Sequence, residues 1–150
     1  MVYVDIYRGI VSHFKIRISE WVMIWPSFGM WAALQIDSSM FTTSPSFSML
    51  AAWADQGTWA MVMALSGVCR LAALVVNGTF KGFAFSPHIR ASASLVGVIV
   101  WSQISLGFLL AYVQSGGALS GAIGWSTMVL LEIVNVHRSL ADVGKNLRER

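Results

Sequence analysis

Charged residues are scarce in this sequence. Aspartate, glutamate, lysine and arginine make up 11% of the 150 residues, whereas hydrophobic residues make up 56% and the mean hydropathy is +0.66. Soluble domains carry roughly 25% charged residues, so this composition excludes an ordinary water-soluble protein. Four membrane crossings of about 20 residues each would use about half of the chain and leave no room for a separate soluble domain.

Cysteine is represented only by Cys69, which excludes an internal disulfide. The three histidines, His13, His88 and His137, are far apart and have no second ligand at metal-site spacing, so we expect no metal site. The sequence also lacks a Ser-His-Asp set, a GxSxG motif, a phosphate-binding loop and paired intramembrane aspartates. We therefore expect neither an enzyme nor a bound cofactor.

Long uncharged stretches are what the sequence has instead. Residues 91–131 carry no formal charge, and one helix of that length would be about 60 Å long, twice the ~30 Å thickness of a hydrocarbon core. The stretch must fold back, and "QSGG" at residues 114–117 supplies the break. The predicted transmembrane helices are residues 18–36, 56–76, 91–113 and 118–136.

The terminal segments are predicted to lie on the membrane surface. In residues 1–18, apolar residues recur every three or four positions, as in an interfacial amphipathic helix, although "VYVDIY" also alternates as a short strand would. This apolar stripe consists of Tyr3, Ile6, Ile10, Phe14 and Ile18. Residues 137–150 form a basic tail with a weaker stripe. Because the N-terminus lacks the uninterrupted apolar region of a secretory signal, we expect nothing to be removed. The predicted fold is one all-α, polytopic membrane domain over residues 1–150.

The distribution of positive charge predicts the orientation. Nine of the ten basic residues lie before the first helix, between the second and third, or after the fourth: Arg8, Lys15, Arg17, Lys81, Arg90, Arg138, Lys145, Arg148 and Arg150. Under the positive-inside rule, both termini and the middle connection are cytoplasmic, and residues 37–55 and 114–117 are outside. The same charges would attract anionic lipids at the cytoplasmic face, so nucleic acid is not an expected partner.

Arg70 is the tenth basic residue and lies within the second predicted helix. Its helical face is small and polar, with Ser66 and Gly67 among its members. An intramembrane arginine avoids lipid, so we expect Arg70 to pair with an acid at similar depth, Glu132 before Glu20. A charge lining a pore or relay, and snorkelling of Arg70 to the interface, remain alternatives.

Small residues in the fourth predicted helix would allow close packing of helices in lipid. "GALSG", from Gly117 to Gly121, is a GxxxG pattern, and Gly124 lies on the same predicted face as Glu132. We expect these residues to face a neighbouring helix.

Three short motifs carry a family resemblance: "RLAALVVNG" (70–78), "SPHIR" (86–90) with Trp101 after it, and Glu20-Trp21. Their order over residues 20–138 resembles that of small, uncharacterised four-helix membrane proteins encoded by tailed bacteriophages and prophages. The resemblance implies a phage or bacterial inner-membrane context, and such a family has no settled activity to carry over.

Three functions fit these observations. The first is a holin-like, lysis-associated protein that forms homo-oligomers in the bacterial inner membrane. The second is a structural or docking subunit of a larger complex: a virion or ejection apparatus, a host complex, or a superinfection-exclusion system. The third is a small ion channel or transporter that uses Arg70 with Glu132.

Overall fold

The computed structural model describes residue 11 and residues 14–79 and 85–148. Every regular element in these residues is helical, in agreement with the predicted all-α fold. The elements are α2 (Ile18–Val22), α3 (Ile24–Ile36), α4 (Met40–Thr43), the 3-10 helix η1 (Pro45–Phe47), α5 (Ser48–Trp53), α6 (Gln56–Thr79), α7 (Ser86–Ser115) and α8 (Leu119–Arg148). Most of the predicted N-terminal amphipathic stripe, Tyr3 to Ile10, lies outside the described residues.

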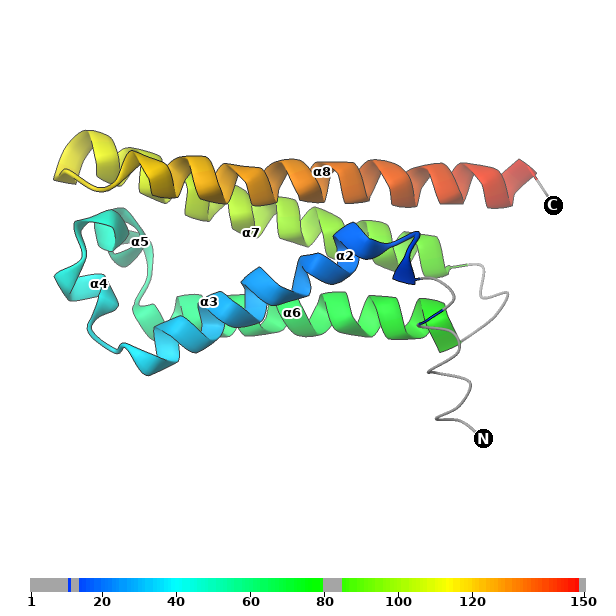
Figure 1. The fold of residues 1–150 in the computed structure, drawn as a ribbon, viewed down its shortest axis with the longest axis horizontal. Helices are drawn as coiled ribbons and strands as arrows, with labels where there is room; N and C mark the ends of the chain where they lie inside the picture. The colour runs from blue at the N-terminus through cyan, green and yellow to red at the C-terminus, as the bar shows by residue number, and fades with distance from the viewer. Residues whose placement is uncertain (1–10, 12–13, 80–84, 149–150) are drawn as a thin grey trace.

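The long helices α6, α7 and α8 form the body of the molecule (Figure 1). α7 and α8 are an antiparallel pair, α2 and α3 run along α6, and the short helices α4 and α5 gather at the end where α7 turns into α8. We call this the loop end of the bundle, and the opposite end, where α8 finishes, the terminal end.

Three helices are long and apolar enough to cross a membrane: Gln56–Asn77, Ser86–Ser115 and Leu119–Lys145. This finding supports a membrane protein. Their outward faces are apolar, as lipid requires, with exposed residues such as Leu65, Ile99 and Ile133.

The first predicted span, residues 18–36, is not one continuous helix. It is divided at Met23 into α2 and α3, and α3 has only 13 residues. Pro26 lacks the N–H that would bond to the carbonyl of Val22, so the helix is interrupted at this point. The Ser27 hydroxyl donates to the Met23 carbonyl at 3.1 Å, at the junction between the two helices. By itself, neither piece is long enough to span a bilayer.

The fourth predicted span and the basic tail form one helix. We predicted a span over 118–136 and a separate tail over 137–150, but α8 continues from Leu119 to Arg148, a length of about 45 Å. The tail stays helical because its buried face continues: Asn135 and Ser139 are fully buried, one turn apart.

α7 and α8 meet along a seam with the coiled-coil period. In both helices the residues at the seam recur at alternating spacings of four and three. The seam of α7 comprises Arg90, Ser94, Gly97, Trp101, Ile104, Phe108 and Ala111, and that of α8 comprises Gly121, Trp125, Met128, Glu132, Asn135, Ser139 and Asp142. Apolar side chains fill the seam toward the loop end, whereas polar and charged side chains occupy it toward the terminal end.

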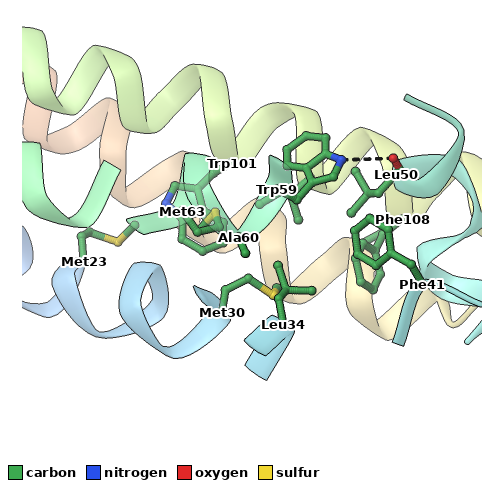
Figure 2. Close-up of a cluster of buried hydrophobic side chains, with 12 residues drawn as sticks. Met23, Met30, Leu34, Phe41, Leu50, Trp59, Ala60, Met63, Trp101 and Phe108 are labelled. Atoms are coloured by element: carbon green, nitrogen blue, oxygen red, sulfur yellow. Dashed lines mark hydrogen bonds between the residues drawn. The ribbon is translucent and has the colours of Figure 1, made fainter. Parts of the chain in front are cut away.

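The apolar core lies in the loop half of the bundle (Figure 2). Trp101 of α7 is fully buried beside Met63 of α6, and its ring stacks on Trp125 of α8 with centroids 5.4 Å apart. The Trp59 indole N–H donates to the Leu50 carbonyl at 3.1 Å, which joins α6 to α5. These aromatic side chains fill the centre of the bundle between the long helices.

The connection over residues 37–55 is more ordered than its Ser/Thr-rich composition predicts. The Gln56 side-chain amide donates to the carbonyls of Leu34 and Asp37 at 2.7 and 2.6 Å, and its oxygen accepts the Phe41 N–H at 3.1 Å. Asp55 caps α6, accepting the Thr58 backbone N–H at 2.8 Å, and this bond lowers the pKa of the Asp55 carboxyl. The loop end is therefore held by hydrogen bonds to both neighbouring helices.

The glycines predicted to pack against helices lie in different surroundings. Gly67 packs against the Phe28 ring, and a Cβ added at Gly67 would lie 3.0 Å from that ring. Ser66, the residue before it, is also buried. Gly121 lies against the Phe108 ring, where an added Cβ would overlap it. However, Gly117 lies in the turn before α8, and Gly124 is exposed with nothing within 4 Å of an added Cβ.

The GxxxG pattern therefore does not form a helical packing face. Gly117 is outside the helix because α7 ends with Gly116 in the left-handed conformation, φ 71°, and α8 starts only at Leu119. Gly124 is exposed because the α8 seam passes through Gly121 and Trp125, which leaves Gly124 on the outer side.

Candidate functional site: two buried arginine networks

Arg70 is buried between three helices and pairs with Glu132. Its guanidinium forms an ion pair with the Glu132 carboxylate and donates a hydrogen bond to the Ser94 hydroxyl at 2.8 Å. The two ion-paired side chains are 4% and 2% exposed, so water and lipid are both excluded. We call Arg70, Ser94, Glu132, Asn135 and Ser19 the central network; it joins α6, α7, α8 and α2.

Local sequence on α7 makes room for this ion pair. Ser94 and Gly97 lie three residues apart on the buried face of α7. A Cβ added at Gly97 would lie 2.6 Å from the carboxyl carbon of Glu132, well inside van der Waals contact. The absence of a side chain at Gly97 therefore allows the Glu132 carboxylate to lie directly against the α7 backbone.

The central network extends from Glu132 to α2. The Asn135 side-chain amide donates to the Glu132 carboxylate at 3.3 Å, and its oxygen accepts the Ser19 hydroxyl at 2.7 Å. Arg138 donates in turn to Ser19 at 3.2 Å. These bonds satisfy buried polar atoms that would be costly to bury unpaired.

A second network surrounds Arg90, close to the terminal end. Its guanidinium contacts both carboxylate oxygens of Glu20, with Nε at 2.9 Å from Oε2, and donates through Nη1 to Asp142 at 2.8 Å. The side chains of Arg90 and Glu20 are 2% and 3% exposed, whereas that of Asp142 is 46% exposed. We call Arg90, Glu20, Asp142 and Arg17 the terminal network; Arg17 lies 3.6 Å from Asp142.

The predicted charged residues are thus divided between the two networks. Arg70 lies with Glu132, the acid we ranked first, and Glu20 pairs with Arg90 instead of Arg70. Arg90 was interpreted only as a topology-determining charge of the middle connection, and its burial was not predicted. A signal was present: Arg90, Ser94 and Gly97 already follow the four-three spacing of a helix seam.

The contacts within the two networks hold helices together. All four charged groups at their centres, Arg70, Glu132, Arg90 and Glu20, face oppositely charged partners inside the protein. Among residues 14–79 and 85–148, no group of three or more histidine, cysteine, aspartate or glutamate side chains could hold a metal ion. The arrangement fixes the relative positions of four helices, and a buried ion pair is well suited to specifying such a register.

The comparisons with known proteins add no relative. No family model, no curated protein and no solved structure matches the chain.

Proposed function

We propose that the chain crosses the bacterial inner membrane four times, with both termini in the cytoplasm. In addition to α6, α7 and α8, the pair α2 and α3 would form one crossing, the first along the chain. Residues 18–36 extend over about 28 Å and run along α6. An even number of crossings agrees with the position of α2 beside the second half of α8, where Arg138 contacts Ser19. The distribution of lysine and arginine supports the cytoplasmic side.

Cysteine accessibility tests this topology in a Cys69→Ala background. A membrane-impermeant maleimide applied to spheroplasts is expected to label Thr43→Cys and Ser115→Cys and to spare His88→Cys and Arg148→Cys until the membrane is broken. All four positions are exposed, so labelling reports the side of the membrane and not burial. Ser86 and Ser139 are unsuitable because both are buried. Labelling of the opposite pair would invert the orientation.

We propose further that the protein is holin-like: a phage or prophage protein that accumulates in the inner membrane as a homo-oligomer and permeabilises it. The filled interior is the observation that supports this over a single-chain channel. Trp101, Met63 and the Arg70–Glu132 pair occupy the centre of the bundle. A water-filled path would therefore have to form between several copies, in contact through their apolar outer faces.

Inducible expression in a bacterium tests the holin-like function. Membrane potential is followed with a fluorescent dye, together with growth and the release of a cytoplasmic enzyme. We expect an abrupt depolarisation some time after induction, once enough copies have accumulated. Another four-helix membrane protein, expressed to the same level, serves as the control for general membrane loading.

Normal potential and growth at that expression level would overturn the holin-like proposal. That outcome would favour the docking subunit, in which the same outer faces bind a virion component or a host complex. A gradual loss of potential that begins at the lowest expression level would favour the channel or transporter.

A further inference from the structure

A polar pocket of about 270 Å³ opens at the terminal end of the bundle, between α2, α7 and α8. It lies beyond the apolar core, next to the Arg90–Glu20 pair. Its polar lining residues are Arg17, Glu20, Arg90, His137, Arg138 and Asp142. The volume is several times the ~30 Å³ that one water molecule occupies in the liquid, so the pocket can hold a small polyatomic group.

The pocket has more positive than negative charge. Three arginines and two carboxylates line it, and Arg90 alone engages both carboxylates. Glu20 uses both its oxygens on Arg90, and Asp142 is also bound to Arg90 at 2.8 Å. One arginine charge offsets one carboxylate, and Asp142 is shared between Arg90 and Arg17, so the lining keeps one excess positive charge. Arg138 already donates to the Ser19 hydroxyl at 3.2 Å and to the Ile16 carbonyl at 2.5 Å, but it has no carboxylate partner among the described residues.

Arg17 supplies donors that lack an acceptor. Within the part of the chain that the structure describes, its Nε and Nη1 atoms are buried and have no hydrogen-bond partner, and Nη2 lies 3.6 Å from Asp142, beyond hydrogen-bond distance. Burial lowers the pKa of Arg17, which lies before the first helical segment, yet a guanidinium remains charged at physiological pH. A buried cation with free N–H groups is costly unless an anion from outside binds it.

We propose that this pocket binds a phosphate group through Arg17 and Arg138. The planar guanidinium forms paired hydrogen bonds to phosphate oxygens, and two arginines facing one pocket can share a single phosphate. The group belongs either to the headgroup of an anionic phospholipid or to free phosphate. The pocket lies at the terminal end of the bundle, which the proposed topology places toward the cytoplasmic face of the membrane, the side on which anionic headgroups attract basic residues.

Ligand-dependent stabilisation tests the site. The purified chain in a neutral detergent is unfolded thermally, with helicity followed by circular dichroism, during titration with short-chain phosphatidylglycerol, short-chain phosphatidylcholine or inorganic phosphate. A ligand that binds only the folded state raises the midpoint in proportion to its affinity. We expect phosphatidylglycerol to raise the midpoint, and Arg17→Gln to weaken its apparent affinity about tenfold, the effect of losing one charge-assisted contact.

Arg148→Gln is the matched control, since it removes the same charge from an exposed position of α8 outside the pocket. It should leave the affinity within about twofold of the parent, as expected for a screened surface charge. Arg138→Gln should weaken binding as Arg17→Gln does. If Arg17→Gln fails to fold, the affinity of Arg138→Gln shows whether the ligand binds in this pocket.

The titrations with phosphatidylglycerol and with inorganic phosphate distinguish the two sources of the phosphate group. Stabilisation by inorganic phosphate but not by phosphatidylglycerol, with the same response to the variants, would assign the site to free phosphate. The proposal is overturned if neither ligand raises the midpoint, if phosphatidylcholine acts as strongly as phosphatidylglycerol, or if Arg148→Gln weakens binding as much as the pocket variants.

Discussion

Arg70→Met is expected to lower the free energy of unfolding by about 3–5 kcal/mol, the cost of leaving a buried charge without its partner. The residue left behind is Glu132, whose side chain is 2% exposed. Asn135 can still donate to the Glu132 carboxylate, but one long hydrogen bond of 3.3 Å from an uncharged amide does not replace a guanidinium. Glu132→Met should cost a similar amount, because among the described residues it leaves the Arg70 guanidinium hydrogen-bonded only to the Ser94 hydroxyl.

The double variant Arg70→Met with Glu132→Met should be more stable than either single variant. Two methionines fill a similar volume without burying charge, and replacing a buried ion pair by apolar residues is often neutral or stabilising. A double-mutant cycle in detergent, with reversible unfolding followed by circular dichroism, measures the coupling directly. We expect a coupling energy of about 3 kcal/mol or more, since almost all of the single-variant cost comes from the missing partner.

Arg148→Met is the control for removing an arginine from this protein. It lies on the exposed end of α8, so its effect should stay within about 0.5 kcal/mol. If Arg70→Met behaves like Arg148→Met, the ion pair contributes nothing to the bundle and Arg70 reaches the interface by snorkelling. If the double variant folds but no longer depolarises the membrane, the pair serves the activity as well as the fold.

Arg90→Met is the second change with a large expected effect. Among the described residues, Arg90 is the only side chain that forms an ion pair or hydrogen bond with the Glu20 carboxylate, and the Glu20 side chain is 3% exposed. We again expect a loss of about 3–5 kcal/mol, nearly all of it from Glu20. The bond to Asp142 adds little, because that carboxylate is 46% exposed and water replaces the lost contact.

Arg90→Lys separates charge from geometry in the terminal network. A lysine keeps the positive charge but cannot contact both oxygens of Glu20 while also reaching Asp142, since its ammonium is a single point donor. Its loss of stability in the same unfolding assay should fall between those of the parent and Arg90→Met. Lys145→Met, an exposed change on α8, is the matched control. A loss for Arg90→Lys as large as that for Arg90→Met would show that the paired geometry, and not the charge, supports α2.

Much of α6 and its central ion pair could be predicted from the sequence. The helical period predicted that Ser66 and Gly67 share the face of Arg70, and all three residues are buried, while Leu65 and Val68 of the same helix are exposed. Depth along the helices was enough to rank Glu132 as the partner of Arg70. Both predictions use only the repeat of the helix and the cost of a charge in an apolar environment.

Other parts depended on contacts between helices. The role of Arg90 could not be predicted from its neighbours in sequence, because its two acids come from α2 and α8, 70 and 52 residues away. That α8 continues without a break past residue 136 could not be predicted, because polar residues there contact other helices, Asn135 through Ser19 of α2 and Asp142 through Arg90 of α7. The GxxxG pattern was misleading because a turn at Gly116 places Gly117 outside the helix.

The sequence by itself determined that the protein is helical and apolar on its outside, and it marked which face of α6 is buried. These features follow from composition and from a 3.6-residue period, which act locally. Only the tertiary structure decided which acid pairs with which arginine and that a polar pocket remains beside Arg17. Ion pairing depends on a few ångströms of distance between atoms of different helices, and that distance is set when the helices pack together.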